Sequence, residues 1–154
     1  MIRSWRLIKA VYAGDAFAGE GARRGGGRWN SKGVRMVYTS GSLSLATLEV
    51  MVHTHFYSAL KNYVCIPIDF DPGFSLSIRL EDLPDNWQTD PIPQSVKEVG
   101  DRWIHNHESV ILKVPSAIIP VDYNYLINPL HRDFDKVIVH SPQKFAFDPR
   151  LLKV

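Results

Sequence analysis

The alternation of apolar and polar residues predicts two strands. In YVCIPIDF (63–70) one face of an extended chain would carry Val64, Ile66, Ile68 and Phe70. Proline has no backbone N–H to donate, so Pro67 indicates that this strand lies at a sheet edge or contains a bulge. The segment MVYTS (36–40) is predicted to be a shorter strand that follows a glycine-rich stretch.

Helical spacing of apolar residues predicts two helices. In SLSLATLEVMVHTHF (42–56) the apolar residues Leu45, Leu48 and Val52 define a stripe that we expect to face the core. Ser42 is available as the N-terminal cap of this helix. The segment SVKEVGDRWIHN (95–106) is the second helix, with one side formed by Val96, Val99 and Trp103.

The remaining segments complete an α+β prediction. Four prolines and two Asp-Pro steps make 71–94 mostly loop and turns. The apolar, β-branched stretches 108–120 and 135–141 indicate strands, and 145–154 closes the domain. Short strands mixed with a few helices favour one compact domain over 1–154, built on a twisted, mostly antiparallel sheet. A strand–GxGxxG–helix unit and a GxxxxGK[ST] motif are both lacking, which excludes Rossmann and P-loop interpretations.

Composition places few limits on function but removes several classes. The chain has 154 residues, of which 45% are hydrophobic, and its net charge of +2 comes from 18 Lys+Arg against 16 Asp+Glu. This balance is too even to indicate a nucleic-acid or membrane partner by itself. One cysteine, Cys65, excludes an internal disulfide. No apolar run approaches the ~20 residues of a membrane span, so we expect a cytoplasmic protein.

Charge becomes informative locally, because the window from Gly21 to Leu48 contains no acidic residue. Its basic residues are Arg23, Arg24, Arg28, Lys32 and Arg35. Guanidinium groups pair well with phosphate, and glycines allow backbone N–H groups to approach an anion. The alternatives are a solvated basic loop or a flexible tether for nucleic acid. Trp29 favours an ordered loop because its ring requires burial, so we expect Arg28 to be held in place and Arg23 and Arg24 to be surface charge.

Glu49 is the first carboxylate after this window. On a helical wheel it lies near Leu45 and Val52, at the edge of the predicted apolar stripe. A carboxylate there must be paired, protonated or functional. One interpretation is a structural ion pair with Arg28. The other is cleavage of NAD, whose nicotinamide leaves as a neutral amine and needs no general acid, so that one Glu suffices to hold the ribose and stabilise an oxocarbenium-like transition state.

Several motifs together resemble a known family. The stretches WRL, GGGRWNSKGVRMVYTSGSLSLATLE, VPSAIIP, NYLINPLH and FAFDPR are similar to those of the RES-domain toxins, the toxin halves of bacterial RES–Xre toxin–antitoxin pairs. The likeness runs from Arg6 to Arg150, and the segment 71–100 contributes little to it. The resemblance implies a fold akin to the ADP-ribosyltransferases, NAD as the substrate and no metal. It also implies an Xre-type helix-turn-helix antitoxin that covers the active site and supplies the only contact with DNA.

The resemblance also assigns site residues. The catalytic residues it implies are Arg28, Tyr38 and Glu49: Arg28 binds phosphate, Tyr38 stacks on nicotinamide, and Glu49 acts on the ribose. The further NAD-binding residues it implies are Arg6, Gly27, Trp29, Asn30 and Ser116. One position departs from the family's transferase branch. Enzymes that modify protein arginine commonly carry Glu or Gln two residues before the catalytic Glu, where this chain has Thr47.

Three functions follow, in order of preference. The first is a toxin that consumes NAD as a glycohydrolase or phosphorylase. The second is a mono-ADP-ribosyltransferase toxin that modifies a cellular protein. The third is a nucleic-acid-binding module that uses the basic cluster at 23–35, whose affinity would fall steeply with salt and would not need Glu49.

Overall fold

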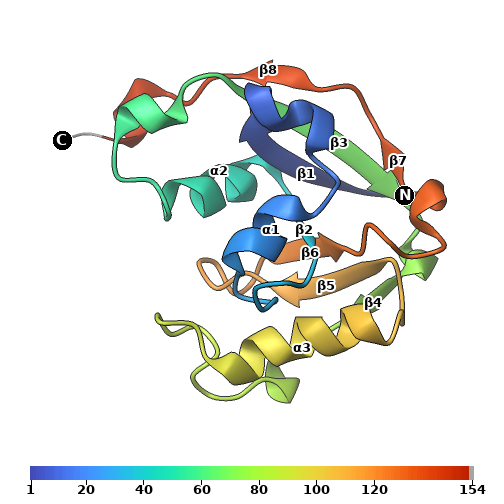
Figure 1. Ribbon diagram of the computed structural model, residues 1–154. Coiled ribbons are helices and arrows are strands. Elements are labelled where there is room, and N and C mark those ends of the chain that lie inside the picture. Colours follow the sequence, from blue (N-terminus) through green and yellow to red (C-terminus); the bar gives the residue numbers. More distant parts are fainter. Residues whose placement is uncertain (153–154) are drawn as a thin grey trace.

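The computed structural model describes residues 1–152, which form a strongly curled sheet with helices packed around it (Figure 1). The strands are β1 (Ile2–Lys9), β2 (Val37–Ser40), β3 (Tyr63–Phe70), β4 (Ser75–Ser77), β5 (Ile111–Pro115), β6 (Tyr123–Ile127), β7 (Ile138–Val139) and β8 (Gln143–Phe145). The α-helices are α1 (Glu20–Gly25), α2 (Leu43–Met51) and α3 (Gln94–His105). Short 3₁₀ turns connect them: η1 (Ala10–Asp15), η2 (Tyr57–Leu60), η3 (Pro72–Phe74), η4 (Leu80–Asp82), η5 (Phe134–Lys136) and η6 (Pro149–Leu151).

The strand order confirms an α+β fold with a mostly antiparallel sheet. The strands follow the order β4-β5-β6-β2-β1-β3-β7, and β8 pairs with a second part of β3. Every pairing is antiparallel except that of β4 with β5. The strands β1 and β6 were not predicted from the sequence, although both lie inside the sheet. Because β6 pairs with β2 and β5, it connects the two halves of the molecule.

Pro67 lies between two partner strands of β3 rather than on an edge strand of the sheet. The strand β3 has β1 on one side along its whole length, and on the other side it pairs first with β8 and then with β7. The β8 pairing ends at Cys65 and the β7 pairing begins at Ile68, so Pro67 falls between them. Its carbonyl accepts a hydrogen bond from the His140 N–H at 3.0 Å. The missing N–H therefore falls where no partner strand requires it.

The helix α2 is shorter than predicted and turns a different face to the core. The Ser42 hydroxyl accepts the Leu45 N–H at 3.1 Å, which confirms the predicted cap, but the helix ends at Met51 instead of continuing to 56. Leu45 and Ala46 are buried, whereas Leu48 is 39% exposed and Val52 is 57% exposed. The predicted stripe was therefore wrong beyond Leu45. The helix rests on β1 and β2, which leaves Leu48 and Val52 outside the core.

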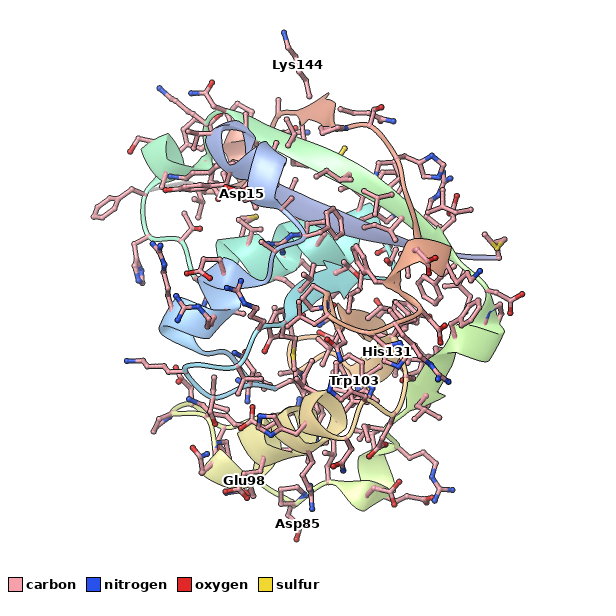
Figure 2. All side chains as sticks on the ribbon, turned by 45° about the vertical axis from the view of Figure 1, so that its right-hand side comes forward. Asp15, Asp85, Glu98, Trp103, His131 and Lys144 are labelled. Atoms are coloured by element: carbon pink, nitrogen blue, oxygen red, sulfur yellow. The ribbon has the colours of Figure 1, made fainter. Side chains whose placement is uncertain are left out.

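The helix α3 was predicted correctly and covers the opposite end of the sheet from α2 (Figure 1). Val96 and Trp103 are buried on its inner side, with Gly100 between them. Figure 2 shows Trp103 turned inward and Glu98 pointing outward from the same helix. The two apolar segments after α3 form shorter strands than expected, because 108–120 contains only β5 and 135–141 contains only β7.

Candidate active site

The glycine-rich stretch is a folded loop organised by Asn30. The Asn30 amide group donates to the carbonyls of Ala22 at 2.8 Å and Val34 at 3.0 Å. Its side-chain oxygen accepts the Tyr38 hydroxyl at 2.6 Å. Trp29 is 2% exposed and packs in the core, where its ring lies 6.3 Å from that of Trp87. These contacts exclude a flexible tether and confirm the ordered loop.

Tyr38 connects this loop to β2. Its hydroxyl donates to Asn30 and accepts the Trp29 backbone N–H at 3.0 Å. Burial raises the pKa of the Tyr38 phenol well above its ordinary value, so the group stays protonated at neutral pH. A side chain on Gly27 would place its Cβ 2.6 Å from the Tyr38 hydroxyl. Gly27 is therefore required by this close approach, and Tyr38 as a whole is half-buried.

Arg28 is oriented by backbone carbonyls. Its Nη1 donates to the carbonyl of Trp87 at 2.8 Å and to that of Thr89 at 3.2 Å. Desolvation lowers the pKa of Arg28, and the charges of Asp90 and Glu49 oppose that shift. No carboxylate within the described residues lies within 4 Å of its guanidinium group. The nitrogens Nε and Nη2 thus keep donors for an anion.

Arg6 is a second cation that has no partner carboxylate among residues 1–152. Its Nε donates to the Ala16 carbonyl at 2.7 Å and its Nη1 to the Tyr38 carbonyl at 3.0 Å. Burial lowers the pKa of Arg6 to about 10, which still leaves it charged at neutral pH. A half-buried, charged guanidinium that contacts only carbonyls among the described residues lacks the anion that would balance its charge. A bound phosphate group would provide one.

Glu49 is fixed through one of its two oxygens. Its Oε1 accepts the Ser116 hydroxyl at 2.9 Å and the Asn124 amide group at 2.7 Å. Asn124 is itself held by the Ser40 hydroxyl, which donates to its side-chain oxygen at 2.8 Å. Within the described residues, Oε2 has no hydrogen-bond partner. The carboxylate is therefore oriented by neutral donors and has one oxygen free for a ligand.

The structural ion pair between Arg28 and Glu49 does not form. Arg28 contacts carbonyls, and Glu49 contacts Ser116 and Asn124. The other arginines of the acid-free window share one carboxylate, because Glu20 pairs with Arg23, Arg24 and Arg35. This agrees with the surface role expected of Arg23 and Arg24, although both lie on the short helix α1. The one carboxylate cancels one of the cluster's five positive charges, so this pairing reduces the charge available to nucleic acid without removing it.

The predicted site residues divide into two groups. Arg6, Arg28, Tyr38 and Glu49 offer donors, an acceptor or a ring surface toward a ligand. The side chains of Trp29, Asn30 and Ser116 are almost fully buried, and the polar groups of Asn30 and Ser116 are already hydrogen-bonded inside the protein. Sequence reasoning missed Asn124, which is 8% exposed. Its sequence signals were a polar residue within the apolar run YNYLI and its place at the start of the family motif NYLINPLH, but that strand was itself not predicted.

The RES domain family model matches residues 3–148. A protein of Yersinia enterocolitica, Toxin Res, is 36% identical over 148 residues, which cover 96% of this chain and 97% of that protein. The chain belongs to the RES-domain toxin family. Another RES relative, from Sphingobium sp. strain YBL2, is 32% identical over 97% of this chain and 96% of its own length, and is named Prs ADP-ribosylating toxin.

A solved structure shows the same fold. The M. tuberculosis MbcT–MbcA toxin–antitoxin complex contains a chain that matches with a TM-score of 0.76 at 19% identity. The match covers 94% of this RES domain and 84% of the solved chain. This likeness confirms the fold class inferred from the resemblance. Over residues 1–152, no helix has the length and apolar character to span a membrane, and no three His, Cys, Asp or Glu residues form a metal-binding group.

Proposed function

We propose that this protein is the toxin of a toxin–antitoxin pair and that it cleaves the nicotinamide–ribose bond of NAD in the cytoplasm. The observation that carries the proposal is the contrast between its charged groups. Arg6 and Arg28 are cations held by carbonyls, and Glu49 is a carboxylate held by neutral donors. A dinucleotide supplies what each lacks: phosphate oxygens for the guanidinium groups and ribose hydroxyls for the free Glu49 oxygen.

The chemistry requires little more than these groups. As the C1′–N bond breaks, its electron pair moves to the pyridinium nitrogen, and nicotinamide leaves uncharged. Positive charge then develops on the ribose, where the Glu49 carboxylate stabilises it while Oε2 accepts a ribose hydroxyl. Water or inorganic phosphate attacks C1′. Water loses its proton to solvent in that step, and phosphate needs no deprotonation when it attacks as the dianion.

Each remaining predicted residue has a part in this proposal. Tyr38 presents its ring to nicotinamide, while Asn30, Gly27 and Trp29 hold the loop that carries Arg28. Ser116 orients Glu49 instead of contacting the nicotinamide ribose directly, because its hydroxyl donates to Glu49 and accepts the Ile118 and Ile119 N–H groups. NAD is the substrate, and no metal enters the proposed reaction.

A transferase activity is the second candidate. It is supported by the relative named Prs ADP-ribosylating toxin, because the same site would serve with a protein side chain as the nucleophile. Thr47 disfavours a protein arginine as the acceptor, because it lacks the carboxylate or amide group that could orient an acceptor guanidinium. Its hydroxyl instead donates to the Leu43 carbonyl within α2 at 2.8 Å.

The proposed partner is an antitoxin of the Xre helix-turn-helix type that covers the active site and alone contacts DNA. The structural neighbour is a toxin in complex with its antitoxin, which supports a partner of this kind. Leu48 and Val52 flank Glu49 on the exposed side of α2, and apolar surface beside a site suits a protein that covers it.

The decisive experiment is NAD consumption by the purified full-length chain with and without inorganic phosphate, with product identification. We expect free nicotinamide in both cases if water is the acceptor, and a phosphorylated ADP-ribose if phosphate is. Incubation of labelled NAD with a cell lysate separates the transferase, which leaves label on a protein band. Glu49→Gln should keep the fold and lose the activity. Undiminished turnover by that variant would exclude the mechanism.

A further inference from the structure

The segment Trp87–Asp90 before α3, which we term the strap, touches both halves of the site. It lies within 71–100, the part of the chain that contributes least to the family resemblance. In Figure 1 the segment between β4 and α3 extends to the same side of the molecule as the loop between β5 and β6. Its contacts reach Arg28 on one side and the turn after Ser116 on the other.

On the Arg28 side the strap supplies backbone carbonyls. The Trp87 and Thr89 carbonyls both accept from Arg28 Nη1, at 2.8 Å and 3.2 Å. An Nη nitrogen carries two hydrogens, so these two contacts use both hydrogens of Nη1. The hydrogens of Nε and Nη2 are left for other acceptors. Trp87 anchors the strap, because it is 6% exposed and packs against Trp29, the neighbour of Arg28.

On the opposite side the strap is held by one side chain. The Gln88 amide group donates to the Ala117 carbonyl at 3.0 Å. Ala117 follows Ser116, whose hydroxyl donates to Glu49 at 2.9 Å. A continuous series of contacts therefore runs from Arg28 through Gln88 and Ser116 to Glu49.

We propose that Gln88 is a positioning residue that sets the separation between the phosphate-binding Arg28 and the ribose-binding Glu49. The inference rests on the proposed function, because it assumes that both residues grip one dinucleotide. Gln88 contacts neither the sugar nor the phosphate. It acts by fixing the strap, and so the orientation of Arg28, against the turn that orients Glu49. Its side chain is exposed, so its replacement leaves the core intact.

The test compares Gln88→Met with Gln143→Met in the full-length protein. Methionine matches glutamine in length but cannot donate to the Ala117 carbonyl. Gln143 is an exposed glutamine on β8 with no side-chain hydrogen bond within the described residues, and serves as the matched control. We expect Gln88→Met to weaken ADP-ribose binding by calorimetry and to raise KM for NAD, each by roughly threefold to tenfold, as loss of one neutral hydrogen bond allows.

A double variant with Arg28→Ala distinguishes a role of Gln88 in positioning Arg28 from a general effect of Gln88 on the structure. In an Arg28→Ala background, Gln88→Met should change ADP-ribose affinity by less than about twofold, because the group that it positions is gone. Hydrogen exchange should also speed up at the amides of 86–90 and 117–119 in Gln88→Met. The proposal is overturned if Gln88→Met behaves like Gln143→Met, if its effect persists fully without Arg28, or if exchange at both segments is unchanged. A wild-type protein that neither binds ADP-ribose nor consumes NAD would instead overturn the proposed function.

Discussion

The amide group of Asn124 lies 2.7 Å from Oε1 of Glu49, although the two residues are 75 positions apart in the chain. Asn124 sits on β6 and Glu49 on α2, so the contact forms only when β6 pairs with β2. Ser40 at the end of β2 holds the other end of the amide. The orientation of the carboxylate is thus a property of the assembled sheet rather than of the helix that carries it.

Replacement of Asn124 by leucine should reduce NAD turnover while the protein stays folded. Leucine keeps the volume and removes the donor, and a hydrogen bond to a charged group is worth about 1.5–3 kcal/mol, or roughly a tenfold to hundredfold loss of kcat. Steady-state kinetics and circular dichroism check both parts. Asn106→Leu, at the exposed end of α3, is the control. Wild-type kcat in Asn124→Leu would show that Glu49 needs no such orientation.

Arg6→Met should weaken ligand binding while changing the stability of the fold only slightly. Removal of a half-buried charge relieves its desolvation, while the carbonyls of Ala16 and Tyr38 lose a donor, so these effects oppose each other. We expect the free energy of unfolding to change by less than about 2 kcal/mol. ADP-ribose affinity should fall by about tenfold or more because a charge-assisted contact to phosphate is lost. Urea denaturation and calorimetry measure the two quantities. Equal affinity in the variant would remove Arg6 from the site.

Gly100→Ala should destabilise the protein and disturb the loop of Arg28 together. A Cβ at this position of α3 would lie 1.7 Å from the Trp29 carbonyl oxygen, and that contact is with backbone, so the loop or the helix must move. Overpacking of this kind costs about 2 kcal/mol or more. Gly14→Ala is the matched control, because its added Cβ meets nothing within 4 Å. Urea denaturation should separate the two variants clearly, and a neutral Gly100→Ala would contradict the close packing.

The acid sensitivity of α1 should depend on Glu20. Hydrogen bonds from Arg23 and Arg24 lower the pKa of Glu20 from its ordinary value of 4.5 to about 2. A depressed carboxyl pKa contributes stability that is fully present above the unfolded value and is lost as the pH falls through the folded value. The urea midpoint of wild type should therefore exceed that of Glu20→Gln above pH 4.5 and converge with it toward pH 2. Glu98→Gln, exposed on α3 and without an ion pair among the described residues, serves as the control.

Local patterns predicted the elements whose apolar residues repeat regularly, and missed those that depend on distant partners. The strand β3 and the helix α3 have clear periodicity, and the structure confirms both. The strand β1 buries Ser4 and Leu7 while Arg3 and Arg6 interrupt it, so its own residues do not alternate as a strand should. The apolar stripe predicted for α2 was wrong beyond Leu45 because a helical wheel does not distinguish buried from exposed apolar residues. Leu48 and Val52 lie on the wheel where core residues would, yet both are exposed beside the candidate site.

The candidate site was predicted in the same uneven way. The sequence pointed to Arg28, Tyr38 and Glu49 through an acid-free window and a family resemblance. It could not show that carbonyls of Trp87 and Thr89 hold Arg28, since backbone groups carry no sequence signal. Nor could it pair Asn124 with Glu49, because that contact requires the register between β2 and β6.

The pairing of Glu20 with Arg23, Arg24 and Arg35 has a consequence for how the proposed substrate is attracted. One carboxylate cancels one of these three positive charges, so the group keeps a net charge of +2 and a field that reaches an anion in solution. Dissolved ions screen that long-range field, whereas Arg6 and Arg28 act at close range, where screening is weak. Capture of the dinucleotide should consequently slow as the ionic strength rises, while its release, which depends on the close contacts, should change little.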